Sequence, residues 1–158
     1  ASGPVLDPRP LTAQVFARRD AGEHAAALAL CEALIQAAPG EVEFQRTRCG
    51  LLASAGDPRA ATTCFRDCLA TFPDQLDLYL NLSDALRYAT DPDAALAALE
   101  ELAHHQPLFP GLAMKRGQAL LALGQSRRAV AEFVREWRLH GGDRCLELVR
   151  EAWKKRRG

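Results

Sequence analysis

A single period runs through most of this 158-residue chain. Pro39, Pro73 and Pro107 follow one another at intervals of 34 residues, and four alanines keep the same interval: Ala27, Ala61, Ala95 and Ala129. A fixed period of roughly 20 to 50 residues indicates a repeat protein, in which each unit buries its apolar face against its neighbours. The period therefore directs the search for function towards an extended binding surface rather than a catalytic pocket.

Further sets of residues that lie one period apart, here called columns, predict the structure of one unit. Glycine recurs at positions 22, 56 and 124, with Thr90 in the third place, and Asp-Pro recurs at 57–58 and 91–92. Glycine reaches positive φ without a steric penalty and so ends a helix. Asp then caps the next helix, and proline suits its first position. The recurring prolines cannot lie inside a helix, so they stop the second one. The unit is a helix, a tight turn, a helix and a stop.

The same signals predict nine helices and no strand. Eight of them form four hairpins, and a ninth follows with apolar residues at helical spacing. The expected ranges are 11–20, 24–37, 42–54, 58–71, 76–88, 92–105, 111–122, 126–139 and 143–156. A composition that is 48% hydrophobic but only 6% aromatic, and rich in Ala and Leu, agrees with helices.

With these columns the chain resembles the tetratricopeptide repeat family. The four alanines match the small-residue slot of its second helix, three prolines match its closing position, and Tyr79 matches its aromatic slot. The resemblance implies an all-α, right-handed α-solenoid of helix-turn-helix hairpins. We expect an extended lead-in or an artificial boundary over 1–10, four repeats over 11–142, and a C-terminal capping helix with a basic tail over 143–158.

The resemblance also implies where a partner binds, because the first helices of successive units line the concave face in this family. Equivalent positions should then stack along a groove at about one helix-packing distance, roughly 8–10 Å. The polar and aromatic members of these columns form the predicted partner-binding site: Thr12, Phe16, Arg19, Arg46, Thr47, Asn81, Asp84, Arg87, Lys115 and Gln118. The alternative is that these side chains only solvate a helix face.

Three of these residues fill slots of the family's carboxylate clamp, which holds the C-terminal carboxylate of chaperone tails. Arg46, Asn81 and Lys115 match by residue type, whereas Gly50 and Gly111 replace an asparagine and a lysine. Each missing charge-assisted hydrogen bond would cost about 1.5–3 kcal/mol. A generic peptide groove is therefore the preferred interpretation over the clamp.

Charge is distributed unevenly although the chain is neutral as a whole. Residues 1–110 contain 8 basic and 15 acidic residues, and residues 111–158 contain 12 and 5, so the net charges are −7 and +7. This asymmetry favours an acidic partner at the C-terminal end or head-to-tail stacking of copies. The tail Lys154, Lys155, Arg156 and Arg157 is a candidate patch for an anionic partner. Cations at a helix C-terminus also stabilise the helix by themselves, without any partner. The tail lacks the interleaved aromatic residues that would favour nucleic-acid binding.

Neither a catalytic motif nor a metal site is predicted. The chain has no phosphate-binding glycine loop, no His-Glu-x-x-His and no nucleophile elbow, so we expect no catalytic residue and no cofactor. Five cysteines, an odd number, argue against a complete disulfide framework. Cys31, Cys49 and Cys68 are interpreted as small buried hydrophobes. Cys64 and Cys68 lie one helical turn apart, but no further pair completes a metal site.

The sequence therefore favours a non-catalytic scaffold or adaptor that binds a peptide or protein segment in its groove. Alternatives are a regulatory or substrate-recruiting arm of a larger enzyme such as a transferase, a secretion-type chaperone, and a self-associating scaffold. No stretch approaches the roughly 18 apolar residues of a membrane span, and no signal peptide is evident. We expect a cytoplasmic location.

Overall fold

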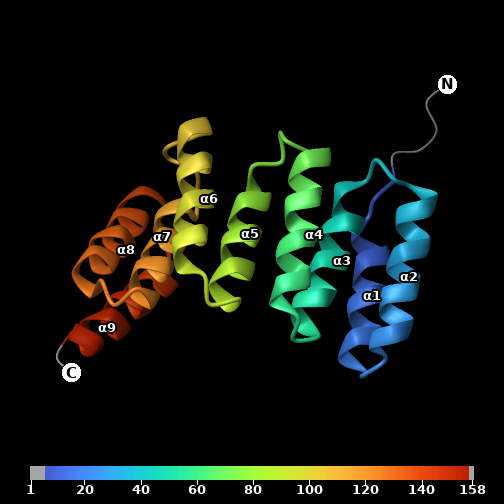
Figure 1. Cartoon of the computed structure of the whole chain (residues 1–158), viewed down its shortest axis with the longest axis horizontal. Helices are drawn as coiled ribbons and strands as arrows, with labels where there is room; N and C mark the ends of the chain where they lie inside the picture. Colours follow the sequence, from blue (N-terminus) through green and yellow to red (C-terminus); the bar gives the residue numbers. More distant parts are fainter. Residues whose placement is uncertain (1–5, 157–158) are drawn as a thin grey trace. The chain divides into compact units, whose positions relative to one another are not determined.

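The chain folds into helices joined by short turns, as the sequence predicts (Figure 1). The computed structural model describes residues 6–156. Within that range it contains nine helices and no strand: α1 (Arg9–Asp20), α2 (His24–Ala37), α3 (Val42–Ser54), α4 (Pro58–Thr71), α5 (Asp77–Tyr88), α6 (Pro92–His105), α7 (Leu112–Ala122), α8 (Ser126–His140) and α9 (Asp143–Arg156). None of the helices in the described range is long and apolar enough to cross a membrane.

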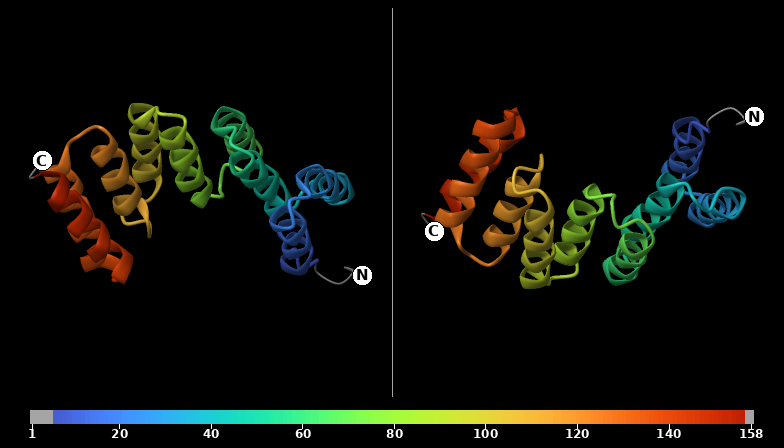
Figure 2. Two further views of the ribbon diagram at one scale, coloured as in Figure 1. Left: turned by 90° about the horizontal axis from the view of Figure 1, so that it is seen from below. Right: turned by 90° about the horizontal axis from the view of Figure 1, so that it is seen from above.

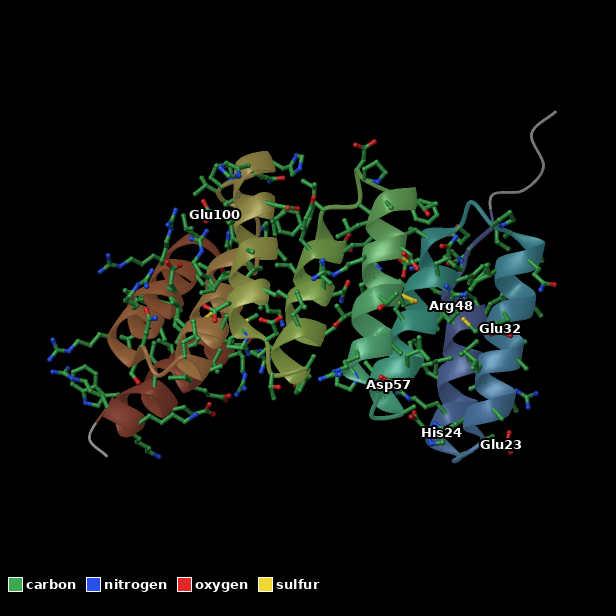
Figure 3. All side chains as sticks on the ribbon, in the orientation of Figure 1. Glu23, His24, Glu32, Arg48, Asp57 and Glu100 are labelled. Atoms are coloured by element: carbon green, nitrogen blue, oxygen red, sulfur yellow. A yellow bond between two sulfur atoms is a disulfide. The ribbon has the colours of Figure 1, made fainter. Side chains whose placement is uncertain are left out.

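The predicted helix signals are confirmed in local geometry. Asp57, labelled in Figure 3, accepts from the backbone N–H of Ala60 at 3.0 Å, and Asp91 accepts from Ala94 at 3.1 Å. Glycines 22, 56 and 124 have φ of 82°, 84° and 76°. Thr90, in the third glycine's place, also has a positive φ of 61°. The turn therefore imposes a left-handed residue at every repeat, whatever its side chain.

Four helix boundaries differ slightly from prediction. Helix α5 begins at Asp77, one residue later than expected, and the other three differences have a local reason. Helix α1 begins at Arg9, inside the expected lead-in, because a proline fits the first turn of a helix. Helix α7 begins at Leu112 because Gly111 before it has φ of 92°. Helix α8 extends to His140, since it lacks a closing proline and ends at Gly141 with φ of 73°.

Packing divides the chain into two compact units, with the boundary between Gln75 and Leu76. The N-terminal unit contains the hairpins α1–α2 and α3–α4, and the C-terminal unit contains α5–α6, α7–α8 and the single helix α9. Figure 2 shows the helices of these hairpins from two further sides. In both units the recurring alanines are fully buried, at 0% exposure. They allow the two helices of a hairpin to approach each other closely.

The two cores use different side chains. In the N-terminal unit, Val15, Ala27, Cys31 and Leu51 form one buried cluster. In the C-terminal unit, Leu99, Leu102 and Leu112 form a second cluster. A third joins α7, α8 and α9 through Leu120, Ala129, Phe133, Leu148 and Ala152. Helix α9 thus completes the core of the last hairpin.

Candidate functional site

Three cationic and acidic residues of the predicted site form one network in the C-terminal unit. The Lys115 ammonium donates to Asp84 Oδ2 at 2.8 Å, which links α7 to α5. Arg87, one turn along α5, contacts the other carboxylate oxygen of Asp84 at 3.3 Å. All three side chains are less than a third exposed, so solvent screens these pairs only in part. Asp84 therefore already neutralises much of the positive charge that the groove interpretation offered to a partner.

A pocket of about 370 Å³ lies beside this network. Helices α5 and α7 contribute the predicted residues Arg87 and Gln118, together with Leu121 and Ala122. Helix α9 forms the other side with residues at helical spacing: Arg144, Leu148, Glu151 and Lys155. The lining of the pocket thus combines aliphatic side chains with charged and amide groups.

The polar groups of the pocket differ in whether they have partners. Arg144 contacts Glu147 at 3.1 Å and Glu151 at 3.7 Å. Lys155 makes no ion pair with any residue of the described chain. The Oε1 atom of Gln118 is buried and accepts no hydrogen bond within that same range. A buried carbonyl oxygen without a donor costs free energy, so this atom favours a ligand that brings an N–H group.

The carboxylate clamp is not assembled in the C-terminal unit. Its lysine slot is Gly111, whose N–H donates to the buried carboxylate of Glu136. A Cβ atom added to Gly111 would lie 3.1 Å from Leu80 Cδ1, and the φ of Gly111 is 92°. A lysine would therefore be strained here. Lys115, which fills a clamp slot by residue type, is paired with Asp84.

The predicted residues of the N-terminal unit lie on α1 and α3. The Arg19 guanidinium stacks over the Phe16 ring at 4.7 Å and donates to the Ser54 hydroxyl at 3.3 Å. Arg46 contacts Glu43 at 3.5 Å. Thr12 donates its hydroxyl to the carbonyl of Arg9 at 3.0 Å.

Thr47 is placed differently from these residues. It is only 5% exposed, and its hydroxyl donates to the carbonyl of Glu43 at 2.7 Å. Because Thr47 packs inside the unit with its hydroxyl satisfied, we remove it from the candidate surface.

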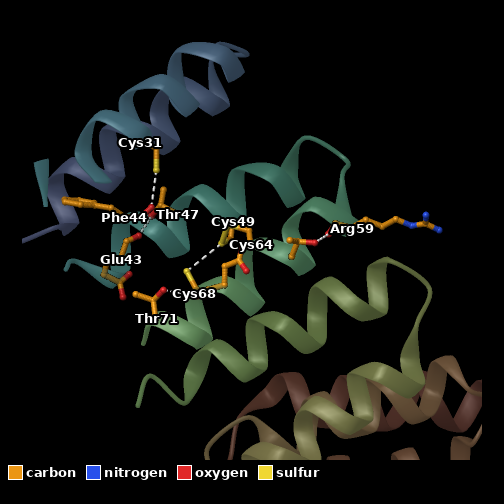
Figure 4. The surroundings of a disulfide bond; sticks show 11 residues. Cys31, Glu43, Phe44, Thr47, Cys49, Arg59, Cys64, Cys68 and Thr71 are labelled. Carbon is orange, nitrogen blue, oxygen red and sulfur yellow. Dashed lines mark hydrogen bonds between the residues drawn. A yellow bond between two sulfur atoms is a disulfide. The ribbon is translucent and has the colours of Figure 1, made fainter. Parts of the chain in front are cut away.

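A sulfur cluster joins α3 to α4 in the N-terminal unit (Figure 4). Cys49 and Cys64 form a disulfide with Cα atoms 5.3 Å apart, and Cys68 Sγ lies 3.9 Å from Cys49 Sγ. Sequence reasoning predicted that Cys31, Cys49 and Cys68 are buried, which is confirmed, but it missed the disulfide. Within residues 6–156 no group of three or more side chains is placed to hold a metal ion.

The remaining thiols of this unit are buried and stay protonated at neutral pH. Burial raises the pKa of Cys31 to about 11, although the nearby Arg48 opposes that shift. Cys31 donates to the carbonyl of Phe44 at 3.1 Å. Burial also raises the pKa of Cys68, so at neutral pH it is a thiol rather than the nucleophilic thiolate.

The basic tail is divided between two surroundings. Lys155 lines the pocket, whereas the Arg156 guanidinium stacks over the Trp153 ring at 4.8 Å. Lys154 is exposed in the last turn of α9. Arg157, the fourth member of the predicted patch, lies outside the described residues.

Helix α9 contributes three pocket residues that sequence reasoning missed, Arg144, Leu148 and Glu151. We predicted α9 as a cap with a basic tail, and Lys155 of that tail also lines the pocket. The signal was present in its pattern, since these four residues recur at intervals of four, three and four and so share one face.

Comparison with protein families shows that residues 80–143 match a tetratricopeptide repeat model. This match, together with the helical hairpins, identifies the type of repeat. Residues 80–143 are tetratricopeptide repeats, and the described chain has the tetratricopeptide fold. The periodic alanines and prolines belong to about four such repeats, followed by a capping helix. The predicted fold class, an all-α solenoid of tetratricopeptide hairpins, is confirmed.

Solved structures support the same fold. A thermophilic tetratricopeptide repeat protein of Thermus thermophilus aligns with a TM-score of 0.75 at 20% identity, over 93% of this chain and 81% of the other. The MamA protein aligns with a TM-score of 0.68 at 17% identity, over 90% and 78%. A tetratricopeptide repeat protein of Parabacteroides merdae aligns with a TM-score of 0.75 at 16% identity, over 90% and 56%. No curated protein matches the chain by sequence.

Proposed function

We propose that this chain is a non-catalytic scaffold that binds an extended segment of a partner protein in the pocket between α5, α7 and α9. The tetratricopeptide fold supports a role in protein–protein interaction. The observation that carries the proposal is the buried Gln118 Oε1, which lines the pocket and has no hydrogen-bond donor among residues 6–156. The backbone N–H of a bound peptide would supply that donor.

The other groups of the pocket define the segment it suits. Lys155 offers a cation without an ion-pair partner in the described chain, and Arg87 offers the N–H groups that Asp84 leaves unused. Leu121 and Leu148 provide apolar contacts. An extended segment with an acidic side chain or a terminal carboxylate next to an aliphatic residue matches this set.

The rest of the predicted surface is kept in the proposal as secondary contacts. Asn81, one turn before Asp84, makes no hydrogen bond to the described part of the chain and can pair with a peptide backbone. The N-terminal unit has its own set of predicted contact residues on α1 and α3: Thr12, Phe16, Arg19 and Arg46.

A random peptide library displayed on phage tests the proposal. Peptides selected on the wild-type protein are synthesised, and their affinity is measured by fluorescence anisotropy for wild type and for the double variant Gln118→Ala with Lys155→Ala. We expect at least about a tenfold loss of affinity, because a hydrogen bond to a charged group contributes about 1.5–3 kcal/mol.

The matched control removes the same kinds of side chain from the outer helix of the last hairpin, by Gln125→Ala with Arg135→Ala. Both residues are exposed on or next to α8. Their substitution should change the affinity less than about twofold. Equal losses in the two double variants, with unchanged circular dichroism, would show that the selected peptides bind elsewhere.

A further inference from the structure

An apolar surface remains uncovered where α8 and α9 come together at the end of the C-terminal unit. Trp137 of α8 is 44% exposed, and Leu146 and Trp153 of α9 are 41% and 45% exposed. Val130 and Val149 are partly buried and pack on the cluster that joins α7, α8 and α9. With Val134, which is also partly buried, these residues make up what we call the terminal face.

On each helix, the terminal face lies on the flank that points away from the preceding hairpin. The other flank of α8 carries Glu132, which contacts Arg116 at 3.7 Å, and Arg116 also contacts Glu100 of α6, in the preceding hairpin, at 3.8 Å. The other flank of α9 lines the pocket with Arg144, Glu151 and Lys155. The apolar residues of the terminal face therefore belong to neither the preceding hairpin nor the peptide pocket.

The spacing of the terminal face suits one further helix. Helices α8 and α9 are joined by Gly141 and Gly142, so residues equally distant from this turn lie at similar levels. Trp137 and Leu146 are each four residues from the glycine pair, Val134 and Val149 seven, and Val130 and Trp153 eleven. Two rows with spacings of three and four residues form the kind of groove that accepts an amphipathic helix.

The charges around the terminal face are positive and unpaired. Arg127 and Arg138 flank its α8 row, and Arg150 and Lys154 flank its α9 row; none of these four makes an ion pair within residues 6–156. Figure 3 shows basic side chains projecting from α8 and α9.

The carboxylates of this region are engaged elsewhere, with the exception of Asp143 at the start of α9. Glu132 contacts Arg116, Glu136 accepts from Gly111, and both Glu147 and Glu151 contact Arg144. Within residues 6–156 the positive rim is therefore not neutralised.

We infer that the terminal face is a second docking surface, which binds an acidic amphipathic helix of a partner protein. The helix would place aliphatic side chains between the rows of α8 and α9 and carboxylates opposite Arg127, Arg138, Arg150 and Lys154. A single-stranded nucleic acid fits less well, because it needs open ring faces for stacking and Arg156 already covers a face of Trp153. This surface is independent of the peptide pocket.

Tryptophan fluorescence provides a direct test, since both tryptophans of the chain, Trp137 and Trp153, lie on the terminal face. The probe is a synthetic helical peptide with leucines along one face and glutamates on both flanks. We expect its addition to shift the tryptophan emission to shorter wavelength in a saturable manner, and we expect raised salt to weaken the binding. A matched peptide with lysines in place of the glutamates should bind at least about tenfold more weakly.

Two variants, at leucines of nearly equal exposure, show where on the surface the peptide binds. Leu146→Glu introduces a carboxylate into the terminal face, whereas Leu139→Glu introduces one elsewhere on α8, where Leu139 is 42% exposed. We expect Leu146→Glu to weaken binding of the acidic peptide about tenfold or more and Leu139→Glu less than about threefold.

Several results would overturn the inference. These are no saturable emission shift up to about 1 mM peptide, equal effects of the two variants, or equal binding of the lysine peptide. Displacement of the acidic peptide by oligothymidine would assign the face to nucleic acid instead. A dimer in sedimentation that Leu146→Glu dissociates would assign it to a second copy of the chain.

Discussion

The N-terminal and C-terminal units share one repeat pattern but are held together by different chemistry. In both, alanines at the repeat position are fully buried and a left-handed residue closes the first helix of the hairpin. The N-terminal unit links α3 to α4 through the disulfide Cys49–Cys64. The C-terminal unit links its helices through Phe133 in the core and through the Lys115–Asp84 pair. The repeat thus determines the hairpin, while the residues between its fixed columns determine how each unit is stabilised.

The largest expected effect comes from the core of the C-terminal unit. Phe133 is 0% exposed and contacts the cluster of α7, α8 and α9. Phe133→Ala should lower the free energy of unfolding by about 3–5 kcal/mol, because it leaves a cavity. Urea denaturation measures the loss, and hydrogen exchange should locate it in α7–α9. Leu139→Ala, at an exposed position of the same helix, is the control and should cost less than about 0.5 kcal/mol.

The disulfide should make the N-terminal unit alone sensitive to reductant. Its two cysteines are 15 residues apart, for which loop-closure entropy predicts a loss of about 3 kcal/mol on reduction. Hydrogen exchange with and without a phosphine reductant should show faster exchange in α3 and α4 and no change in α7–α9.

The control for reduction is the double variant Cys64→Ser with Cys68→Ser, which should not respond to the reductant. The single variant Cys64→Ser is insufficient, because Cys68 Sγ lies 3.9 Å from Cys49 Sγ and can replace the lost partner. Faster exchange in the C-terminal unit on reduction would contradict the separation of the two units.

A smaller effect on stability is expected at Thr90, which occupies the turn position where the other repeats have glycine. Thr90 has φ of 61°, whereas Gly56 has φ of 84° at the equivalent position of the N-terminal unit. A left-handed conformation costs a residue with a side chain about 1–2 kcal/mol. Thr90→Gly should therefore stabilise the protein by about 1 kcal/mol, and the reciprocal Gly56→Thr should destabilise it by a similar amount. Thermal unfolding of both variants checks the opposite signs.

The smallest effect is expected from the ion-pair network on α5 and α7. Asp84→Asn removes the carboxylate that Lys115 and Arg87 share. Because the three side chains are partly exposed, the loss of stability should be about 1 kcal/mol or less. The same change frees two cations beside the pocket, so the affinity for acidic peptides should rise. A fall in that affinity would show that Asp84 itself contacts the peptide.

Sequence reasoning predicted the helices well, because turns and caps are local. The Asp-Pro pairs, the glycines and the closing prolines each act within a few residues, and the helix ends differ from prediction by at most two residues. The site was predicted less completely. Asn81, Arg87 and Gln118 follow from the repeat register, but the partners of Lys115 and Asp84 depend on side-chain conformation across two helices. The register of α3 against α4, which brings Cys49 to Cys64, also involves long-range packing that the period does not specify.

The most direct test of the account is hydrogen exchange of the protein saturated with a library-selected peptide. Binding in the pocket predicts slower exchange in α5, α7 and α9, which carry Arg87, Gln118 and Lys155. It also predicts that this slowing is lost when Gln118 and Lys155 are both replaced by alanine. Slower exchange confined to the outer helices α6 and α8, or unchanged exchange in α5, α7 and α9, would contradict the proposed function.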